Sequence, residues 1–167
     1  MTKAVFLDRD GTINVDTGYG TRISDLDFEK NAIKGLKAFQ DRGYVLVIIS
    51  NQGGIARGRH TEEEAKEFNA ELARRLETQG VRVRGIYYCP HYEKGSVRKY
   101  AIQCRCRKPE LGLVEQALKD NPDIDLSKII FIGDKKQDIH TGRNAGCLAS
   151  ILVKTGKGGR AMPMNLL

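Results

Sequence analysis

Long apolar runs, tryptophan and low-complexity segments are missing from this 167-residue chain. No apolar run approaches the roughly 20 residues that a membrane-spanning helix needs, and Ala4–Leu7 is too short for the core of a signal peptide. No internal repeat or linker rich in proline or serine divides the chain, which is typical of one domain. We therefore expect a cytoplasmic protein with one folded domain over residues 1–155 and a flexible tail over residues 156–167.

Aromatic residues are also scarce, at 7% of the chain. They do not alternate with basic residues in the pattern that stacks on single-stranded nucleic acid. The net charge of +7 comes from 28 basic and 21 acidic residues. This excess suits an anionic partner, either nucleic acid or a phosphorylated small molecule, but a solvated basic surface explains it equally well.

Short apolar runs alternate with stretches of helical periodicity. Strands are predicted at residues 4–7, 45–49, 84–88, 129–132 and 148–153. Helices are predicted at residues 31–41, 61–79, 110–119 and 137–145. Thr61 and Glu64 have the spacing of a capping box at the start of the second helix. Apolar strands separated by helices predict an α/β fold in three layers, with a parallel Rossmann-like sheet covered on both faces.

Polar residues follow several of these strands. Ligands of parallel sheets bind at the carboxyl ends of the strands, and we expect four residues to share that rim: Asp8, Ser50, Cys89 and Asp134. In FLDRDGT, Asp8 and Asp10 are two positions apart, so in an extended segment their carboxylates point the same way. A divalent cation such as Mg²⁺ would relieve their repulsion. The alternative is a turn at Asp10-Gly11 without a ligand.

Three further stretches carry polar residues toward the same rim. In IISNQGG, the Ser50 hydroxyl and the backbone N–H groups after it could hold a phosphate oxygen. In IFIGDKKQD, Asp134 supplies a third carboxylate and Lys135 a nearby positive charge. In CRCRKP, Lys108 precedes Pro109, which is expected to start a helix and so to place the lysine rigidly.

Taken in order, LDRDGT, ISNQ, RKP and IGDKKQD resemble the four-motif signature of the haloacid dehalogenase superfamily of phosphatases, across Ala4 to Val153. The resemblance implies a Mg²⁺-dependent phosphoric monoester hydrolase, and there is no room between Asp10 and Ser50 for a large cap domain. The Cys-x-His and Cys-x-Cys pairs before Arg-Lys-Pro resemble a narrower group, the D-glycero-D-manno-heptose 1,7-bisphosphate 7-phosphatases and the related histidinol-phosphate phosphatases. GIYYCPH, GSV, CRKP, GDK and VKTGK favour the heptose enzymes.

This resemblance also implies roles for individual residues. Asp8 would attack phosphorus and become an aspartyl phosphate, and Asp10 would act as the general acid and then the general base. Ser50 and Lys108 would hold the remaining phosphoryl oxygens. The carboxylates of Asp8 and Asp134 and the backbone carbonyl of Asp10 would bind Mg²⁺. The substrate would contact Asp16, Thr17, Gly18, Tyr19, Asn51, Gln52, Gly53, Arg107 and Lys135, with Arg107 suited to a second phosphate.

The segment between residues 89 and 106 gathers most of the metal-binding side chains of the chain. Three sulfurs and one nitrogen suit structural tetrahedral Zn²⁺ with no position left for water, and they come from Cys89, His91, Cys104 and Cys106. The residues between them are mostly polar and could not order themselves by apolar burial. Zinc would therefore order the loop and also direct Arg107 and Lys108. The alternatives are four unrelated side chains or disulfides, and a reducing compartment disfavours disulfides.

Two other functions stay open from the sequence, a histidinol-phosphate phosphatase and a zinc-stabilised nucleic-acid-binding module. The second has no use for aspartates at one rim, where they would repel phosphates. We expect a monomeric enzyme of carbohydrate metabolism, supplying lipopolysaccharide or S-layer precursors, which acts on a phosphorylated sugar and binds neither nucleic acid nor membrane. His60 and His140 have no evident partners, so surface roles are expected for both.

Overall fold

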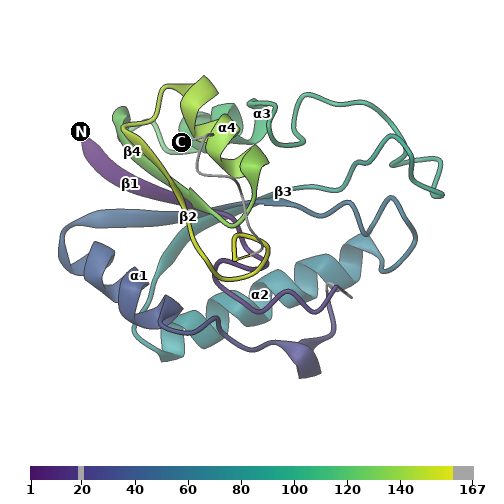
Figure 1. Cartoon of the computed structure of the whole chain (residues 1–167), viewed down its shortest axis with the longest axis horizontal. Helices are drawn as coiled ribbons and strands as arrows, with labels where there is room; N and C mark the ends of the chain where they lie inside the picture. The colour runs from purple at the N-terminus through teal and green to yellow at the C-terminus, as the bar shows by residue number, and fades with distance from the viewer. Residues whose placement is uncertain (19–20, 160–167) are drawn as a thin grey trace.

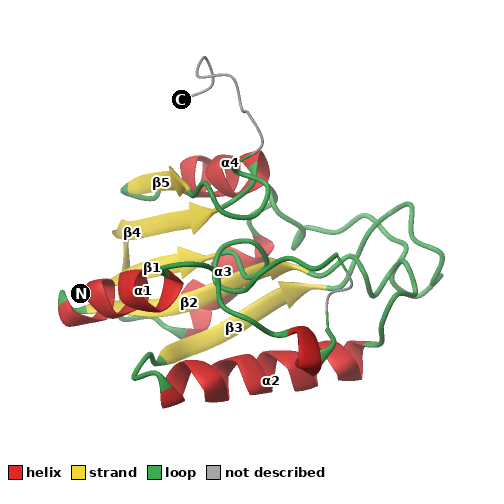
Figure 2. Cartoon of the chain, turned by 60° about the horizontal axis from the view of Figure 1, so that its bottom comes forward, coloured by secondary structure: helices red, strands yellow, loops and turns green. Residues whose placement is uncertain are grey.

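The computed structural model describes residues 1–18 and 21–159. The strands of this part of the chain are β1 (Thr2–Leu7), β2 (Tyr44–Asn51), β3 (Val83–Cys89), β4 (Ile124–Gly133) and β5 (Ala149–Leu152). The helices are α1 (Ala32–Asp41), α2 (Glu62–Thr78), α3 (Gly112–Asp120) and α4 (Lys136–Ala145), with a 3₁₀ turn at Ile23–Asp25. The strands form one parallel sheet in the order β3-β2-β1-β4-β5 (Figure 2). The α/β fold predicted from the sequence is confirmed.

The sheet lies between two layers of helices, with α1 and α2 on one face and α3 and α4 on the other (Figure 1). Successive residues of a strand point to opposite faces, so β1 contributes to two apolar cores. Val5 and Leu7 pack with Leu36 of α1 and residues of α2. Ala4 and Phe6 pack with residues of α3. Burial on both faces explains why the strands read as unbroken apolar runs.

Local signals set the ends of several helices as expected. The Thr61 hydroxyl accepts a hydrogen bond from Glu64 N at 3.1 Å, and the Glu64 carboxylate accepts one from Thr61 N at 2.7 Å, so the predicted capping box opens α2. Gly146 ends α4 in the left-handed conformation, with φ of 80°. Such a conformation favours glycine because it has no β-carbon.

Two of the boundaries that differ from the prediction bear on the site. Strand β2 continues to Asn51, so Ser50 lies inside the strand rather than after it. Helix α3 begins at Gly112 and not at Pro109, which follows a cis peptide bond. Residues 107–110 form a turn instead, in which Glu110 N donates to Arg107 O at 2.9 Å.

The carboxyl ends of the strands share one edge of the sheet, and the long loop after β3 extends beyond it (Figure 2). The backbone beyond β5 returns to this edge, so the first residues of the expected tail lie beside the rim. Lys157 N donates to Asp134 at 2.8 Å, and the Thr155 hydroxyl donates to Gly11 O at 2.8 Å. Residues 160–167 lie outside the described part of the chain. None of the helices within the described ranges combines the length and hydropathy needed to cross a bilayer.

Candidate active site

Asp8 follows β1 directly and is almost fully buried, at 3% exposure. Two lysines contact its two carboxylate oxygens: Lys108 Nζ lies 2.9 Å from Oδ1, and Lys135 Nζ lies 3.3 Å from Oδ2. Burial alone would raise the pKa of Asp8, but the two ammonium groups outweigh it and hold the pKa well below its usual range. Asp8 is therefore an ionised carboxylate between two cations, at the edge where parallel sheets bind ligands.

Lys108 is buried to 2% exposure and has three oxygen partners. In addition to Asp8, its ammonium group donates to Ile49 O at 2.7 Å and lies 2.6 Å from a carboxylate oxygen of Asp138. Burial lowers the pKa of Lys108, but the two carboxylates raise it further, so the lysine is charged. Lys108, two residues after Cys106, thus places a fixed positive charge beside Asp8.

Asp138 was missed by the sequence analysis. It lies in the first turn of α4, where its Oδ2 accepts a hydrogen bond from Lys135 N at 3.0 Å. Burial and the charge of Asp8 raise the pKa of Asp138 to about 6, against the opposite effect of Lys108. Its position four residues after Asp134 in GDKKQD was the available signal. In the fold this spacing brings the side chain back to the rim.

Carboxylate oxygens of Asp8, Asp134 and Asp138 lie within 4.8 Å of one another. One oxygen of Asp134, Oδ1, is buried and has no hydrogen-bond partner among the described residues, and its nearest cation is Lys135 Nζ at 3.5 Å. Burial raises the pKa of Asp134. Oxygen ligands in a compact, partly unsatisfied group fit a hard divalent cation. The residues present therefore suit Mg²⁺.

The side chain of Asp10 does not join this carboxylate group, contrary to the expectation that it would point the same way as Asp8. It turns instead to Arg9, whose Nη2 lies 2.9 Å from Oδ2, and it accepts hydrogen bonds from Asn14 at 2.9 Å and Gln52 at 3.1 Å. The physical reason is the burial of Arg9, which is fully enclosed and needs a counter-ion. Asp10 faces the cavity described below.

Arg9 is a second residue that the sequence analysis missed. Its guanidinium also donates to Asn69 at 2.8 Å and to Gln52 at 3.0 Å, and it lies 4.5 Å from the centre of the Phe68 ring. Asn69 and Phe68 belong to α2, and Gln52 lies in the turn after β2. They hold Arg9, and through it Asp10, in one orientation.

Two residues of the ISNQ stretch form side-chain hydrogen bonds at the end of β2. Ser50 is buried, and its hydroxyl accepts a 2.5 Å hydrogen bond from Gln52. Asn51 forms a reciprocal pair with the backbone of Lys108, donating to Lys108 O at 3.1 Å and accepting from Lys108 N at 2.9 Å. The end of β2 is thereby joined to the Arg-Lys-Pro turn.

A cavity of about 470 Å³ opens above this rim. Nine residues from the sequence analysis line it, namely Asp10, Asp16, Thr17, Gly18, Asn51, Gln52, Gly53, Arg107 and Lys135. Six others were not predicted, namely Gly54, Arg57, Arg59, His60, Gln137 and Lys157. Tyr19 lies outside the described residues. Five basic side chains against two acidic ones favour an anionic ligand.

The surface role expected for His60 is wrong. The imidazole lies against Gly54, where an added β-carbon would come within 2.4 Å of the ring. Both ring nitrogens are buried, without hydrogen-bond partners in the described part of the chain. Burial and the nearby charge of Arg9 lower the pKa of His60. The tight turn over Gly54 brings this side chain to the cavity, and no pattern in the sequence marks it.

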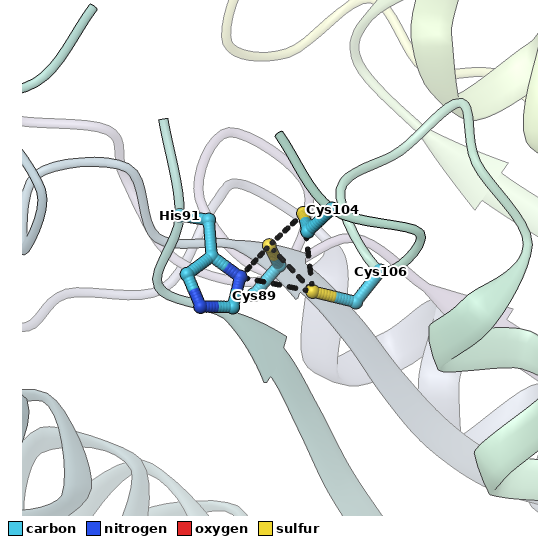
Figure 3. A group of neighbouring side chains, drawn as sticks. All are labelled: Cys89, His91, Cys104 and Cys106. Carbon is cyan, nitrogen blue, oxygen red and sulfur yellow. Dashed lines mark hydrogen bonds between the residues drawn. The ribbon is translucent and has the colours of Figure 1, made fainter. Parts of the chain in front are cut away.

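The four predicted zinc ligands meet at the base of the loop after β3 (Figure 3). Their sulfur and Nδ1 atoms are separated by 2.9–3.6 Å in five of the six pairs, and the cysteines are not joined by disulfides. A tetrahedral site with Zn–S bonds of about 2.3 Å places its sulfurs about 3.8 Å apart, so the group fits zinc with a small expansion. The loop also holds the wall of the cavity, because Arg107 Nη1 donates to His91 O at 3.1 Å.

Comparisons with known proteins agree with this geometry. The HAD-hydrolase-like family model matches residues 105–164. The chain is 46% identical to D-glycero-beta-D-manno-heptose-1,7-bisphosphate 7-phosphatase of Haemophilus ducreyi, over 93% of this chain and 85% of that protein. It is 43% identical to D-glycero-alpha-D-manno-heptose-1,7-bisphosphate 7-phosphatase of Photorhabdus laumondii, over 92% of this chain and 84% of that protein.

A solved structure shows the same fold with ligands bound. D,D-heptose 1,7-bisphosphate phosphatase from B. bronchiseptica, complexed with magnesium and phosphate, superposes with a TM-score of 0.81 at 28% identity. The match covers 95% of this chain and 84% of that one. Sequence identity, fold and the rim of aspartates and lysines lead to one conclusion: the chain belongs to the family of D-glycero-D-manno-heptose-1,7-bisphosphate 7-phosphatases, within the haloacid dehalogenase-like hydrolases.

Proposed function

We propose that this protein is a Mg²⁺-dependent phosphatase that removes the C7 phosphate of D-glycero-D-manno-heptose 1,7-bisphosphate. The observation that carries the proposal is the buried, ionised Asp8 held between Lys108 and Lys135 beneath a cationic cavity. Relatives at 40–46% identity carry the name of this activity. A carboxylate that stays ionised is available as a nucleophile, and the two cations favour the approach of a phosphate dianion.

The reaction would proceed in two displacements. An oxygen of Asp8 attacks phosphorus, the bond from phosphorus to the sugar oxygen breaks, and Asp10 gives a proton to the departing oxygen. Water then attacks the aspartyl phosphate, Asp10 takes its proton, and inorganic phosphate leaves with Asp8 regenerated. The hydrogen bonds from Arg9 support this role, because they keep Asp10 at the cavity and away from the carboxylate group below.

The carboxylates of Asp8 and Asp134, with the backbone carbonyl of Asp10, would hold Mg²⁺, which when bound offsets negative charge on the phosphate. Asp138 is a further carboxylate at this position, and its ion pair with Lys108 suits a positioning role. Ser50 and Lys108 would contact the phosphoryl oxygens that the cation leaves free.

Substrate recognition would fall to the residues that line the cavity and, as the resemblance implies, to Tyr19. Asp16, Thr17 and Gly18 line the cavity from the segment after β1, and Asn51, Gln52 and Gly53 line it from the end of β2 and the turn after it. Lys135 is placed to contact the reacting phosphate, since it already touches Asp8. Arg107 is suited to the second phosphate, because a guanidinium can hold phosphate oxygens in pairs.

The Cys89, His91, Cys104 and Cys106 group would hold a structural Zn²⁺. Free thiols at this group suit a reducing compartment, so we place the enzyme in the cytoplasm, in the supply of heptose for surface polysaccharides such as lipopolysaccharide. The oligomeric state proposed here is the monomer expected from the sequence.

The experiment that tests this function is a phosphate-release screen of purified protein with and without Mg²⁺. The substrates are the alpha and beta anomers of the heptose 1,7-bisphosphate, other sugar bisphosphates and histidinol phosphate. We expect Mg²⁺-dependent release from a heptose bisphosphate with the highest kcat/KM. A preference for histidinol phosphate would contradict the proposal, as would salt-sensitive retention on nucleic acid without any phosphatase activity.

A further inference from the structure

We propose that Tyr92 is a positioning residue for the second phosphate of the substrate. Its ring, carried by the loop of residues 89–106, would align the guanidinium groups of Arg57 and Arg107 along the cavity wall. This inference rests on the proposed function, since a second phosphate is what the two arginines would bind.

Two guanidinium groups pack on one ring. Arg57 Cζ lies 4.2 Å and Arg107 Cζ lies 5.1 Å from the centre of the Tyr92 ring. Both arginines line the cavity, whereas Tyr92 does not belong to its described lining. The negative face of an aromatic ring attracts cations within about 6 Å. The ring therefore favours an arrangement that the mutual repulsion of two cations would otherwise oppose.

Arg107 is held from two further sides. Its Nη1 donates to His91 O at 3.1 Å, and an added β-carbon at Gly53 would lie only 2.9 Å from the same nitrogen. That β-carbon would also lie 3.4 Å from the β-carbon of Tyr92. The guanidinium thus occupies a slot between Gly53 and Tyr92. With one edge anchored in this way, its plane is set before a ligand arrives.

The orientation of the Arg57 side chain depends more strongly on the Tyr92 ring than that of Arg107 does, because Arg57 is exposed. Its backbone is fixed by hydrogen bonds: Arg57 N donates to Gly53 O at 3.1 Å, and Ala56 O next to it accepts from Val97 N at 2.9 Å. Gly95 also lies against Ala56, where an added β-carbon would come within 2.4 Å of the carbonyl oxygen. The contact with Tyr92 selects one of the many rotamers that an exposed arginine side chain can adopt.

Backbone hydrogen bonds within the loop set the position of Tyr92 itself. Tyr92 follows His91 directly, its N–H donates to Tyr100 O at 3.1 Å, and its carbonyl accepts from Gly95 N at 2.9 Å. Both backbone polar groups are therefore used within the loop. The orientation of the ring follows from the loop and does not need the substrate.

Two substitutions at Tyr92 test the inference. Tyr92→Leu removes the aromatic face, and Tyr92→Phe keeps it. With the heptose bisphosphate as substrate, we expect Tyr92→Leu to raise KM about tenfold while kcat changes less than about twofold, consistent with the loss of two cation–π contacts. Tyr92→Phe should restore the wild-type KM. With p-nitrophenyl phosphate, which has one phosphate, kcat/KM should be the same for all three proteins.

A matched control is Tyr44→Leu. Tyr44 also carries a cation on its ring, Lys3 Nζ at 4.6 Å, but it lies at the start of β2, away from the rim. Its substitution should leave KM for both substrates unchanged. Zinc content, measured by atomic emission, should be the same in every variant.

Several results would overturn the inference. These are an unchanged KM for the bisphosphate in Tyr92→Leu, an equal loss with p-nitrophenyl phosphate, or a Tyr92→Phe variant as impaired as Tyr92→Leu. If Tyr92→Leu loses zinc, Arg57→Gln tests the inference in a protein that keeps Tyr92. An unchanged KM of Arg57→Gln for the bisphosphate would then overturn the inference. A wild-type protein that hydrolyses no sugar bisphosphate would contradict the proposed function itself.

Discussion

The ammonium group of Lys108 donates a 2.9 Å hydrogen bond to Asp8, although 100 residues separate them in the chain. Lys108 is also the second residue after Cys106, the last member of the zinc-ligand group. The proposed zinc site and the proposed nucleophile are therefore connected through two residues of backbone. We therefore expect the order of the loop after β3 and the ion pair between Lys108 and Asp8 to depend on each other.

Replacement of Lys108 should destabilise the fold as well as abolish turnover. Lys108→Met leaves the buried carboxylates of Asp8 and Asp138 without their shared cation. Removal of one partner from a buried ion pair costs about 3–5 kcal/mol, and we expect a loss of this size in the free energy of unfolding. Urea denaturation without Mg²⁺ measures it. The control is Lys136→Met, at an exposed lysine in α4, which should change the free energy of unfolding by less than about 0.5 kcal/mol. A loss below about 1 kcal/mol in Lys108→Met would contradict this description of the site.

Replacement of Asp8 should separate catalysis from folding. Asp8→Asn removes the nucleophile but keeps the shape of the side chain, so we expect a folded protein that retains zinc and loses turnover by more than about 10³-fold. Phosphate release and circular dichroism measure the two effects. Asp41→Asn, at the exposed end of α1, is the control and should retain full activity. Substantial turnover by Asp8→Asn would exclude Asp8 as the nucleophile.

Replacement of Asp10 should affect the two displacements differently. With p-nitrophenyl phosphate, whose leaving group needs no proton, Asp10→Asn should still form the aspartyl phosphate but hydrolyse it slowly. We expect a burst of about one p-nitrophenol per chain, followed by turnover about 10²–10⁴-fold below wild type. Rapid-quench kinetics would detect the burst. Steady turnover at the wild-type rate would show that Asp10 is not the acid and base.

Removal of zinc should expose three thiols and loosen one loop. We expect one zinc per chain in the purified protein. After a strong chelator removes it, Cys89, Cys104 and Cys106 should react with an alkylating reagent. Cys147 is not in the zinc-ligand group, and burial raises the pKa of its thiol to about 11, so it should react slowly both before and after the metal is removed. Mass spectrometry of the labelled peptides measures the change at each cysteine.

The same treatment should make the segment between residues 90 and 103 sensitive to protease, because its polar residues depend on the metal for order. Cys147→Ser is the matched control and should retain zinc and protease resistance. A metal-free protein whose loop resists protease as well as the zinc-bound form does would contradict a structural role for the metal.

The sheet and its rim could be predicted because each depends on short-range patterns. Unbroken apolar runs mark strands buried on both faces, and the residue after such a run must lie at the carboxyl edge. This reasoning places Asp8 and Asp134 correctly. The spacing of cysteine and histidine residues likewise predicted which four side chains meet after β3.

The orientation of Asp10 could not be predicted, because it depends on a partner whose burial the sequence does not show. Arg9 looks like a surface arginine until Asn69, sixty positions away, is brought beside it. His60 and Lys157 also depend on tertiary structure to reach the cavity. The turn over Gly54 places His60 there, and the segment after β5 places Lys157 there. Tertiary contacts of this kind leave no periodic signal in the chain.

The central claim is that the aspartates and lysines at the rim form a phosphatase centre for the C7 phosphate. The most direct test is phosphorus-31 NMR of the heptose 1,7-bisphosphate incubated with the protein and Mg²⁺. We predict that the C7 ester signal is replaced by inorganic phosphate while the C1 signal persists, and that Asp8→Asn leaves both signals intact. Loss of the C1 signal first, or both signals unchanged with the wild-type protein, would contradict the claim.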